Sequence, residues 1–236
     1  MSNSNTDYGG RRELILAAAV ALFCRKSYDA VSVDDVCESV GVAHGLVSYH
    51  FGGKRGLFTA AVESVADELL EYERPRQSEV SPAEKLRGSL RRRFEYARKN
   101  PSKVMLFLNS HSRDPEIERF LNTLRSRTMY QWSVNIGCLD HLDTSPKWLV
   151  SLRGWLGWMD GVLLESTESV DIEIEYLIDN CVQALVTAVR ITNGLRYDEE
   201  AEFAALGMVI SSSTGEPTSP SLDLRAEDAV RIGQVS

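Results

Sequence analysis

The sequence predicts an all-α protein, with an N-terminal three-helix domain followed by a C-terminal helical domain. Two observations lead to this fold class. Apolar residues recur at spacings of three and four in the long segments, as they do in helices that bury one face. The sequence lacks the alternation of apolar and polar residues that is typical of half-buried strands.

The first helix is expected from about Arg11 to Lys26. The segment before it, residues 1–10, is polar and is expected to be disordered. The apolar face of the helix consists of one stripe with two neighbours beside it: Leu14, Ala18 and Leu22, with Ile15 and Phe23.

A second, shorter helix is predicted to begin after Ser32. A serine is a good N-cap, and the carboxylates of Asp34 and Asp35 in the first turn favour the positive end of the helix. Gly41 is expected to end this helix in a left-handed conformation, since glycine has no Cβ to oppose it.

A third helix is expected from about Ala43 to His50. Ala43, Val47 and Phe51 form its apolar stripe, which leaves polar and small residues on another face: His44, Gly45, Ser48 and Tyr49. Two short helices joined by a tight glycine turn form a helix-turn-helix, whose second helix enters the major groove of DNA. The residues alone leave an ordinary surface hairpin of two helices as the alternative.

The segment from Gly41 to Leu57 resembles the recognition segment of the TetR family of bacterial transcription regulators. The usual pattern there is G-V-S-x-G-x-L-Y-x-H-F-x-x-K-x-x-L, and the likeness extends over about residues 11–62. The chain departs from the pattern at Ala43, where a serine is usual, and at Ser48, where a tyrosine is usual.

The resemblance implies contacts with double-stranded DNA. His44 would reach a base edge or a phosphate, and Gly45 would let the backbone approach the duplex. His50 would contact a phosphate or, alternatively, cap the end of its helix. The full set of expected DNA-binding residues is Ser32, His44, Gly45, Ser48, Tyr49, His50 and Lys54.

The charge distribution is compatible with a specific DNA binder. The net charge of −8 argues against a general nucleic-acid coat. Residues 1–56 hold six basic and six acidic side chains, so the rest of the chain carries the whole −8. Residues 40–56 contain Lys54, Arg55 and two histidines but no acid, which predicts a small local positive patch.

From Lys54 onward the pattern predicts further helices. Proline and glycine signals divide them, and a capping box, Ser81-Pro82-Ala83-Glu84, opens one. We expect a DNA-binding domain over residues 1–56, a helical ligand-binding and dimerisation domain over 57–194, and a largely disordered tail over 195–236.

The last two helices are predicted to form a dimer interface. Leu149, Leu156 and Leu163 recur every seven residues, and the final helix, from about Asp171 to Asn193, is apolar on two sides. Such a helix must be buried on two sides, against its own core and against a partner. A monomer with a fully buried last helix is the alternative.

The resemblance also implies a small-molecule pocket among the C-terminal helices. Apolar effectors are expected, and His111, Arg125 and Asp160 could orient a polar end. The candidate lining residues are aromatic or Met side chains that could equally be plain core: Phe94, Met105, Phe107, Met129, Trp132, Trp155 and Trp158.

Enzymatic and metal sites find no support in the sequence. The four cysteines are scattered without a C-x-x-C motif, the histidines lack metal-ligand spacing, and no phosphate-binding glycine loop occurs. We expect no cofactor. A redox-sensing cysteine is left open. Without a signal peptide or a transmembrane run, we expect a cytoplasmic protein.

We therefore predict a homodimeric repressor of transcription that an apolar small molecule releases from its operator. Two other classes are left open: an architectural or division-associated DNA binder on the same fold without an effector, and an α-helical enzyme in which the motif is a coincidence. The sequence gives neither the operator nor the effector, and it does not decide between repression and activation.

Overall fold

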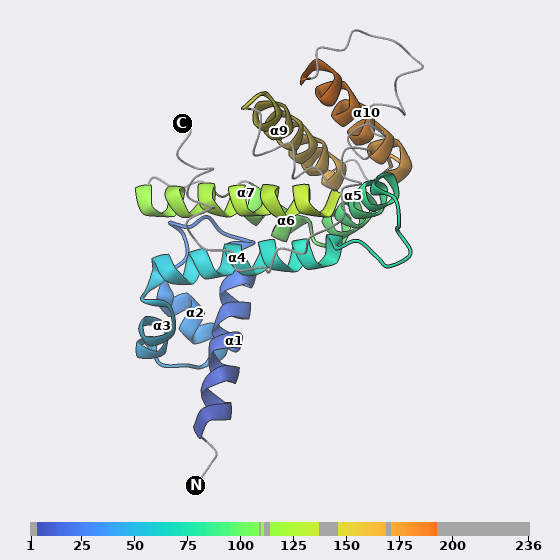
Figure 1. Ribbon diagram of the computed structural model, residues 1–236. Helices are drawn as coiled ribbons and strands as arrows, with labels where there is room; N and C mark the ends of the chain where they lie inside the picture. Colours follow the sequence, from blue (N-terminus) through green and yellow to red (C-terminus); the bar gives the residue numbers. More distant parts are fainter. Residues whose placement is uncertain (1–3, 109, 111–113, 137–145, 169–170, 193–236) are drawn as a thin grey trace. The chain divides into compact units, whose positions relative to one another are not determined.

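The computed structural model describes residues 4–108, 110, 114–136, 146–168 and 171–192, and these contain helices and no strands (Figure 1). The all-α prediction is confirmed. The helices are α1 (Ser4–Phe23), α2 (Val33–Val40), α3 (His44–Phe51), α4 (Lys54–Glu73), α5 (Pro82–Lys99), α6 (Pro101–Leu108), α7 (Pro115–Ile136), α9 (Pro146–Glu168) and α10 (Ile174–Thr192).

The chain divides into two compact units. Unit 1 comprises residues 1–68 and 100–124, and unit 2 comprises residues 69–99 and 125–236. The division falls within α4 and within α7. This division follows which residues pack together. The boundary that we expected after residue 56 divides a DNA-binding from a ligand-binding part, and it stays a prediction. The predicted tail, residues 195–236, lies outside the described residues.

The first helix differs from the prediction in two respects. α1 begins at Ser4, so residues 4–10, which we expected to be disordered, are helical. Its buried face is Ile15, Ala19 and Phe23, while Leu14 is 48% exposed. Both stripes have helical spacing, and the bulky Phe23 selects the second, since its ring meets that of Phe58 with centroids 5.0 Å apart.

A helix from Lys54 onward was predicted, and α4 provides much of the core of unit 1. Its buried side chains are Leu57, Phe58, Ala61, Val62, Val65 and Ala66, and the stripe continues into unit 2 with Leu69. Burial of this kind stabilises a helix by roughly 1.5–3 kcal/mol per large aliphatic side chain, which exceeds what helix propensity alone provides.

In unit 2, α5, α9 and α10 pack against one another. The predicted stripe of α10 is buried at Leu177, Ile178, Cys181 and Leu185, and Val186 and Val189 on the second stripe are buried as well. The predicted capping box at the start of α5 is confirmed, because Glu84 N–H donates to Ser81 Oγ at 3.2 Å and Ser81 N–H donates to Glu84 Oε2 at 2.8 Å.

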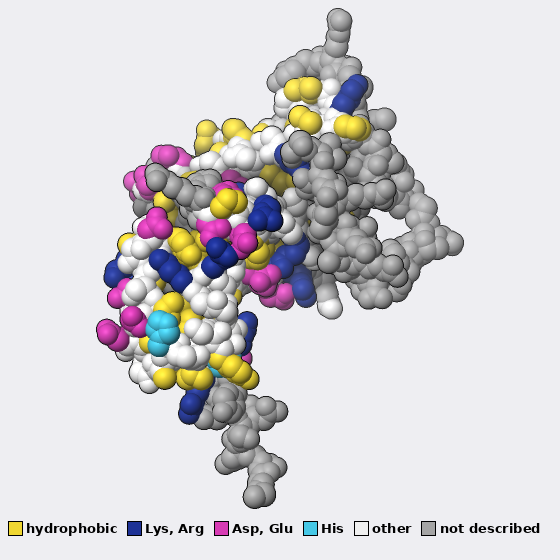
Figure 2. All heavy atoms as spheres, turned by 90° about the vertical axis from the view of Figure 1, so that its left-hand side faces the viewer, with side chains coloured by type: hydrophobic (Ala, Val, Ile, Leu, Met, Phe, Trp, Pro, Cys, Tyr) yellow, Lys and Arg dark blue, Asp and Glu magenta, His cyan; other side chains and the backbone are white. Residues whose placement is uncertain are grey.

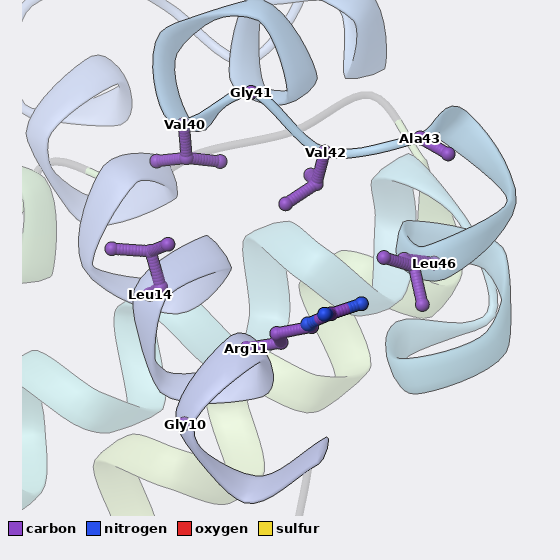
Figure 3. Close-up of a pocket in the computed structure, with 8 residues that line it drawn as sticks. All are labelled: Gly10, Arg11, Leu14, Val40, Gly41, Val42, Ala43 and Leu46. Carbon is purple, nitrogen blue, oxygen red and sulfur yellow. The ribbon is translucent and has the colours of Figure 1, made fainter. Parts of the chain in front are cut away.

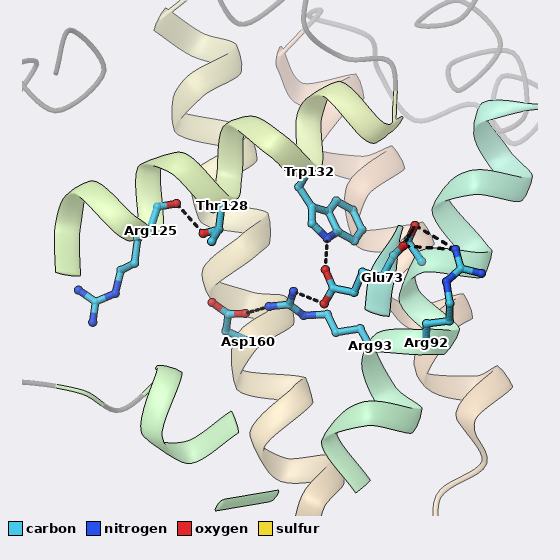
Figure 4. Close-up of polar contacts among 8 residues, drawn as sticks. Glu73, Arg92, Arg93, Arg125, Thr128, Trp132 and Asp160 are labelled. Atoms are coloured by element: carbon cyan, nitrogen blue, oxygen red, sulfur yellow. Dashed lines mark hydrogen bonds and ion pairs between the residues drawn. The ribbon is translucent and has the colours of Figure 1, made fainter. Parts of the chain in front are cut away.

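A charged network that the sequence did not predict lies inside unit 2 (Figure 4). Arg93 Nη1 donates to Glu73 Oε1 at 2.7 Å, and Arg93 Nη2 donates to Asp160 Oδ1 at 2.9 Å. Trp132 Nε1 donates to the other oxygen of Glu73 at 2.8 Å. Burial raises the pKa of the Glu73 carboxyl, although Arg93 and Trp132 act in the opposite direction.

Candidate nucleic-acid interface

The helix-turn-helix begins with the predicted cap at Ser32. Asp35 N–H donates to Ser32 Oγ at 3.0 Å, and Ser32 N–H donates to Asp35 Oδ2 at 2.8 Å. Hydrogen bonds to the Asp35 carboxyl from the backbone N–H and from the side chain of Ser32 lower its pKa. Ser32 is therefore engaged in the cap of α2, and its contact with a phosphate stays a prediction.

The turn between α2 and α3 has the conformation that the sequence predicted. Gly41 is left-handed, with φ 66° and ψ 38°, and its N–H donates to Cys37 O. Ala43 is the N-cap of α3 and provides no side-chain hydrogen bond, so the departure from the family's usual serine leaves the end of this helix without a side-chain cap.

α3 buries one side and exposes the other. Val47 is fully buried, whereas His44, Gly45, Ser48 and Tyr49 are exposed, Tyr49 to 75%. These four are among the seven residues that the sequence predicted for DNA contact, and the contact itself stays a prediction. A Cβ added at Gly45 would meet nothing within 4 Å, so packing inside the protein does not require glycine there.

The predicted apolar stripe of α3 needs a correction. Only Val47 is buried, while Ala43 is exposed and Phe51 is half-buried. The Phe51 ring instead lies under the guanidinium of Arg12, with Arg12 Cζ 5.2 Å from the ring centroid. α3 is too short for three residues along one stripe to reach the core, because Ala43 precedes its first turn.

His50 and Lys54 are more enclosed than the exposed face of α3. His50 is half-buried, and its Nε2 is buried without a hydrogen-bond partner among the described residues, so a phosphate contact would involve Nδ1 or a rotated ring. Lys54 Nζ lies 4.5 Å from the centroid of the Tyr28 ring and donates to Asp29 O at 3.4 Å. Its predicted phosphate contact therefore competes with contacts inside unit 1.

Sequence reasoning missed three acidic partners of the expected basic patch. Arg55 forms ion pairs with Asp114, just before α7, and with Glu116 in its first turn, and the hydrogen bond that Arg55 donates to Asp114 raises the pKa of Arg55. His44 Nδ1 lies 2.7 Å from Asp34 Oδ1. Figure 2 views the side on which α3 lies in Figure 1, and it shows acidic and basic side chains interspersed there.

An open groove of about 550 Å³ adjoins the turn before α3 (Figure 3). It lies between the N-terminal half of α1 and the α2–α3 turn. Arg11 extends along it towards α3, and its walls combine apolar side chains with polar atoms. Its lining residues are Gly10, Arg11, Leu14, Val40, Gly41, Val42, Ala43 and Leu46.

The predicted ligand residues are distributed over both units. Met105 and Phe107 belong to unit 1, whereas Phe94, Met129, Trp132, Trp155 and Trp158 belong to unit 2. The Trp132 and Trp155 rings are neighbours, with centroids 5.4 Å apart, and both are buried. Met105 and Trp158 are about two-fifths exposed. Asp160 binds Arg93, and His111 lies outside the described residues.

The cysteines that the structure describes are poor nucleophiles. Cys37 and Cys181 are buried, and burial raises the pKa of Cys181 to about 12. Burial also raises the pKa of Cys24 and of Cys37. Within the described residues, groups of three potential metal ligands do not occur. In the same part of the chain, each helix is too short or too polar to cross a membrane.

The fold and the α2–α3 geometry define a helix-turn-helix protein. Residues 15–61 match the family described as "Bacterial regulatory proteins, tetR family". This match covers α2 and α3, so the helix-turn-helix domain of the chain is similar to that of the TetR family.

Two curated relatives have similar sequences. The HTH-type transcriptional repressor KstR2 of Mycolicibacterium smegmatis is 25% identical over 111 residues, which are 47% of this chain and 54% of that protein. The regulator IcaR of Staphylococcus aureus, described as a negative transcriptional regulator of the biofilm operon icaADBC, is 31% identical over 58 residues, 25% of this chain and 31% of that protein. The chain thus matches about half or less of the length of these relatives.

Solved structures share the fold over most of the chain. A tetR-family transcriptional regulator from Streptomyces coelicolor has a TM-score of 0.62 at 24% identity, and the match covers 86% of this chain and 89% of that one. The fatty acid degradation regulator FadR from Bacillus halodurans has a TM-score of 0.58 at 15% identity, and the match covers 79% and 97%. At these identities the likeness shows the fold alone.

Proposed function

We propose that this chain is a sequence-specific DNA-binding regulator of transcription that acts as a repressor. The observation that carries the proposal is the exposed face of α3, where His44, Ser48 and Tyr49 project from a helix anchored by the buried Val47. These are side chains that hydrogen-bond to base edges and phosphates, and the second helix of a helix-turn-helix is the element that enters the major groove. KstR2 and IcaR, both named as negative regulators, support repression.

The regulator acts as a homodimer in this proposal. Leu163 of the predicted leucine repeat is buried within the chain itself, and the apolar side chains that α9 exposes are instead Val150 and Trp158, at 71% and 42%. Gly154, Gly157 and Gly161 are exposed on the same helix, and a Cβ at each would meet nothing within 4 Å. Small residues beside exposed apolar ones allow a partner helix to approach closely. A two-fold dimer would present two α3 helices to two half-sites of DNA.

Release by an apolar small molecule is the second part of the proposal. The aromatic and Met side chains of unit 2, above all the neighbouring Trp132 and Trp155, support a ligand site of this chemistry. The ligand would favour a conformation of the dimer in which the two α3 helices no longer fit the half-sites. This requires a ligand that binds the two conformations with different affinities.

Fluorescence anisotropy with the DNA that lies beside this protein's own gene tests the proposal. We expect tight binding that weakens as salt rises, and weaker binding to a scrambled duplex of the same composition. Equal affinity for both duplexes would favour an architectural DNA binder instead. Failure to bind either duplex at low salt would contradict DNA binding altogether.

The same assay tests the effector. A panel of lipids, sterols and other apolar compounds is added to the protein–DNA complex, and thermal shifts are recorded in parallel. We expect at least one compound both to stabilise the protein and to lower its affinity for DNA. A panel in which every compound leaves stability and DNA affinity unchanged would contradict release by an apolar ligand.

A further inference from the structure

An acidic side chain of α2 contacts the first residue of α3. Asp34 Oδ1 lies 2.7 Å from His44 Nδ1, although the two residues are ten positions apart. The two side chains are 73% and 59% exposed. The contact therefore lies on the surface of the helix-turn-helix, beside the face that carries Ser48 and Tyr49.

The chemistry of the pair fixes the orientation of the imidazole ring. A carboxylate can only accept hydrogen bonds, so Nδ1 must carry the hydrogen in this contact. The Nε2 atom at the opposite edge of the ring is then left for a contact with DNA. This holds for the neutral and for the protonated imidazole alike, because both can have a hydrogen on Nδ1.

The Asp34–His44 pair contributes little to the stability of the fold. Ion pairs between exposed side chains stabilise proteins weakly, because water already solvates both partners. Asp34 is also unnecessary for the cap of α2, which Ser32 and Asp35 complete between themselves. An acid close to a DNA-contacting helix repels phosphates, so Asp34 carries a cost for non-specific binding.

We infer that Asp34 is a positioning residue for DNA readout, which holds His44 so that Nε2 faces a base edge in the major groove. This inference rests on the proposed function. A side chain held in one orientation discriminates better between bases, because it loses less conformational freedom on binding and cannot turn to suit an alternative base. Asp34 thus lowers overall affinity for DNA and raises sequence selectivity.

The experiment measures selectivity base pair by base pair. Each variant is incubated with a duplex library in which single base pairs of a wild-type-selected operator are replaced, and the bound DNA is sequenced. Affinity for an unrelated duplex is measured by anisotropy in parallel. The variants are D34A, H44A, the double variant, D34N and E38A; circular dichroism and thermal unfolding establish that each is folded.

We expect D34A and H44A to lose discrimination at the same base pair, by at least about fivefold, since a base contact is worth roughly that much or more. The double variant should be no worse than H44A. D34N should keep the discrimination, because its amide oxygen can also accept from Nδ1–H. D34A, D34N and E38A should all bind the unrelated duplex more tightly, since each removes a negative charge from α2.

Two results would overturn the inference: unchanged discrimination in D34A, or losses in D34A and H44A that add in the double variant. Loss of discrimination in E38A would also overturn it, because Glu38 is an exposed acid of the same helix and would then have the same effect through charge alone. A wild-type chain that enriches no preferred sequence would instead contradict the proposed function.

Discussion

Arg93 holds together the buried charges of unit 2. It is 6% exposed and binds Glu73, which is 1% exposed, and Asp160. Burial acts to lower the pKa of Arg93, but the two carboxylates beside it raise the pKa above its usual value. The network links α4, α5, α7 and α9, because each of these helices provides one of its members (Figure 4). Movement of any one of the helices would leave a polar group of the network without its partner.

Replacing Arg93 by methionine should therefore be costly. The R93M variant leaves the buried Glu73 without its cation, and we expect the free energy of unfolding to fall by roughly 3–5 kcal/mol. Urea unfolding followed by tryptophan fluorescence measures this. The control is R87M on the same helix, where Arg87 pairs with Glu175 and Asp179 at the surface, and there we expect a loss of about 0–1 kcal/mol. Similar losses in both variants would contradict a special role for Arg93.

Glu79 makes the stability of unit 2 depend on pH in a direction that can be predicted. A hydrogen bond from Arg92 holds the pKa of the Glu79 carboxyl below its usual value of 4.5. A group with a lowered folded-state pKa stabilises the fold above its unfolded pKa, and this stabilisation disappears as the pH falls through the folded-state pKa. We expect E79Q to be less stable than the wild type at pH 7 and to approach it as the pH falls below 4.5. A constant difference in urea midpoints between the two pH values would contradict this.

Individual charges were the hardest feature to predict from the sequence. Glu73 and Arg93 are separated by twenty residues, and Arg55 and Asp114 by fifty-nine. Apolar periodicity indicates which face of a helix is buried, but it does not indicate which acidic side chain pairs with which basic one. A clue was available for Glu73 alone, since it occupies the buried stripe of α4 one turn after Leu69.

At the scale of the element, Gly45 in α3 and Gly56 in the first turn of α4 have opposite roles. A Cβ at Gly56 would lie 1.7 Å from Phe51 O, so the start of α4 can approach the end of α3 only with glycine there. A Cβ at Gly45 would project into open space on the face predicted to meet DNA. Gly56 is thus required for the packing of α4 against the end of α3. Gly45 is not required for packing, and we propose that it allows DNA to approach closely.

Alanine at these two positions should separate stability from binding. We expect G56A to lower the melting temperature of the protein strongly, because a backbone atom must move. G45A should leave the melting temperature unchanged or raise it, since alanine favours helix by up to about 1 kcal/mol. It should nevertheless weaken operator binding, because the methyl group occupies space at the duplex. Unimpaired binding by G45A, in anisotropy with operator DNA, would contradict close approach at this position.

Elements were predicted well where their cause is local. The N-cap at Ser32, the capping box at Ser81 and the left-handed Gly41 depend on residues within four positions, and the structure confirms all three. The buried stripe of α1 was assigned wrongly, because Leu14 and Ile15 both begin stripes of helical spacing. The second stripe ends at Phe23, whose ring packs against the rings of Tyr28 and of the more distant Phe58.

The whole molecule combines a net charge of −8 with an exposed face of α3 that has few basic side chains. Lys54 and Arg55 both have partners inside unit 1, which leaves hydrogen-bonding side chains rather than cations to dominate the exposed face of α3. Affinity should then depend more on sequence than on bulk attraction to phosphates. The match to the TetR family over residues 15–61 is compatible with this, because it covers the helix-turn-helix and its support helix.

The most direct test of the central claim compares the wild type with the double variant S48A/Y49A on the DNA beside the protein's own gene. Both side chains are exposed, so the variant should fold normally, and S27A serves as a surface control outside α2 and α3. By anisotropy, we predict selective binding by the wild type and by S27A, and loss of selectivity over scrambled DNA in S48A/Y49A. Selective binding that survives in S48A/Y49A would mean that the exposed face of α3 does not read the sequence.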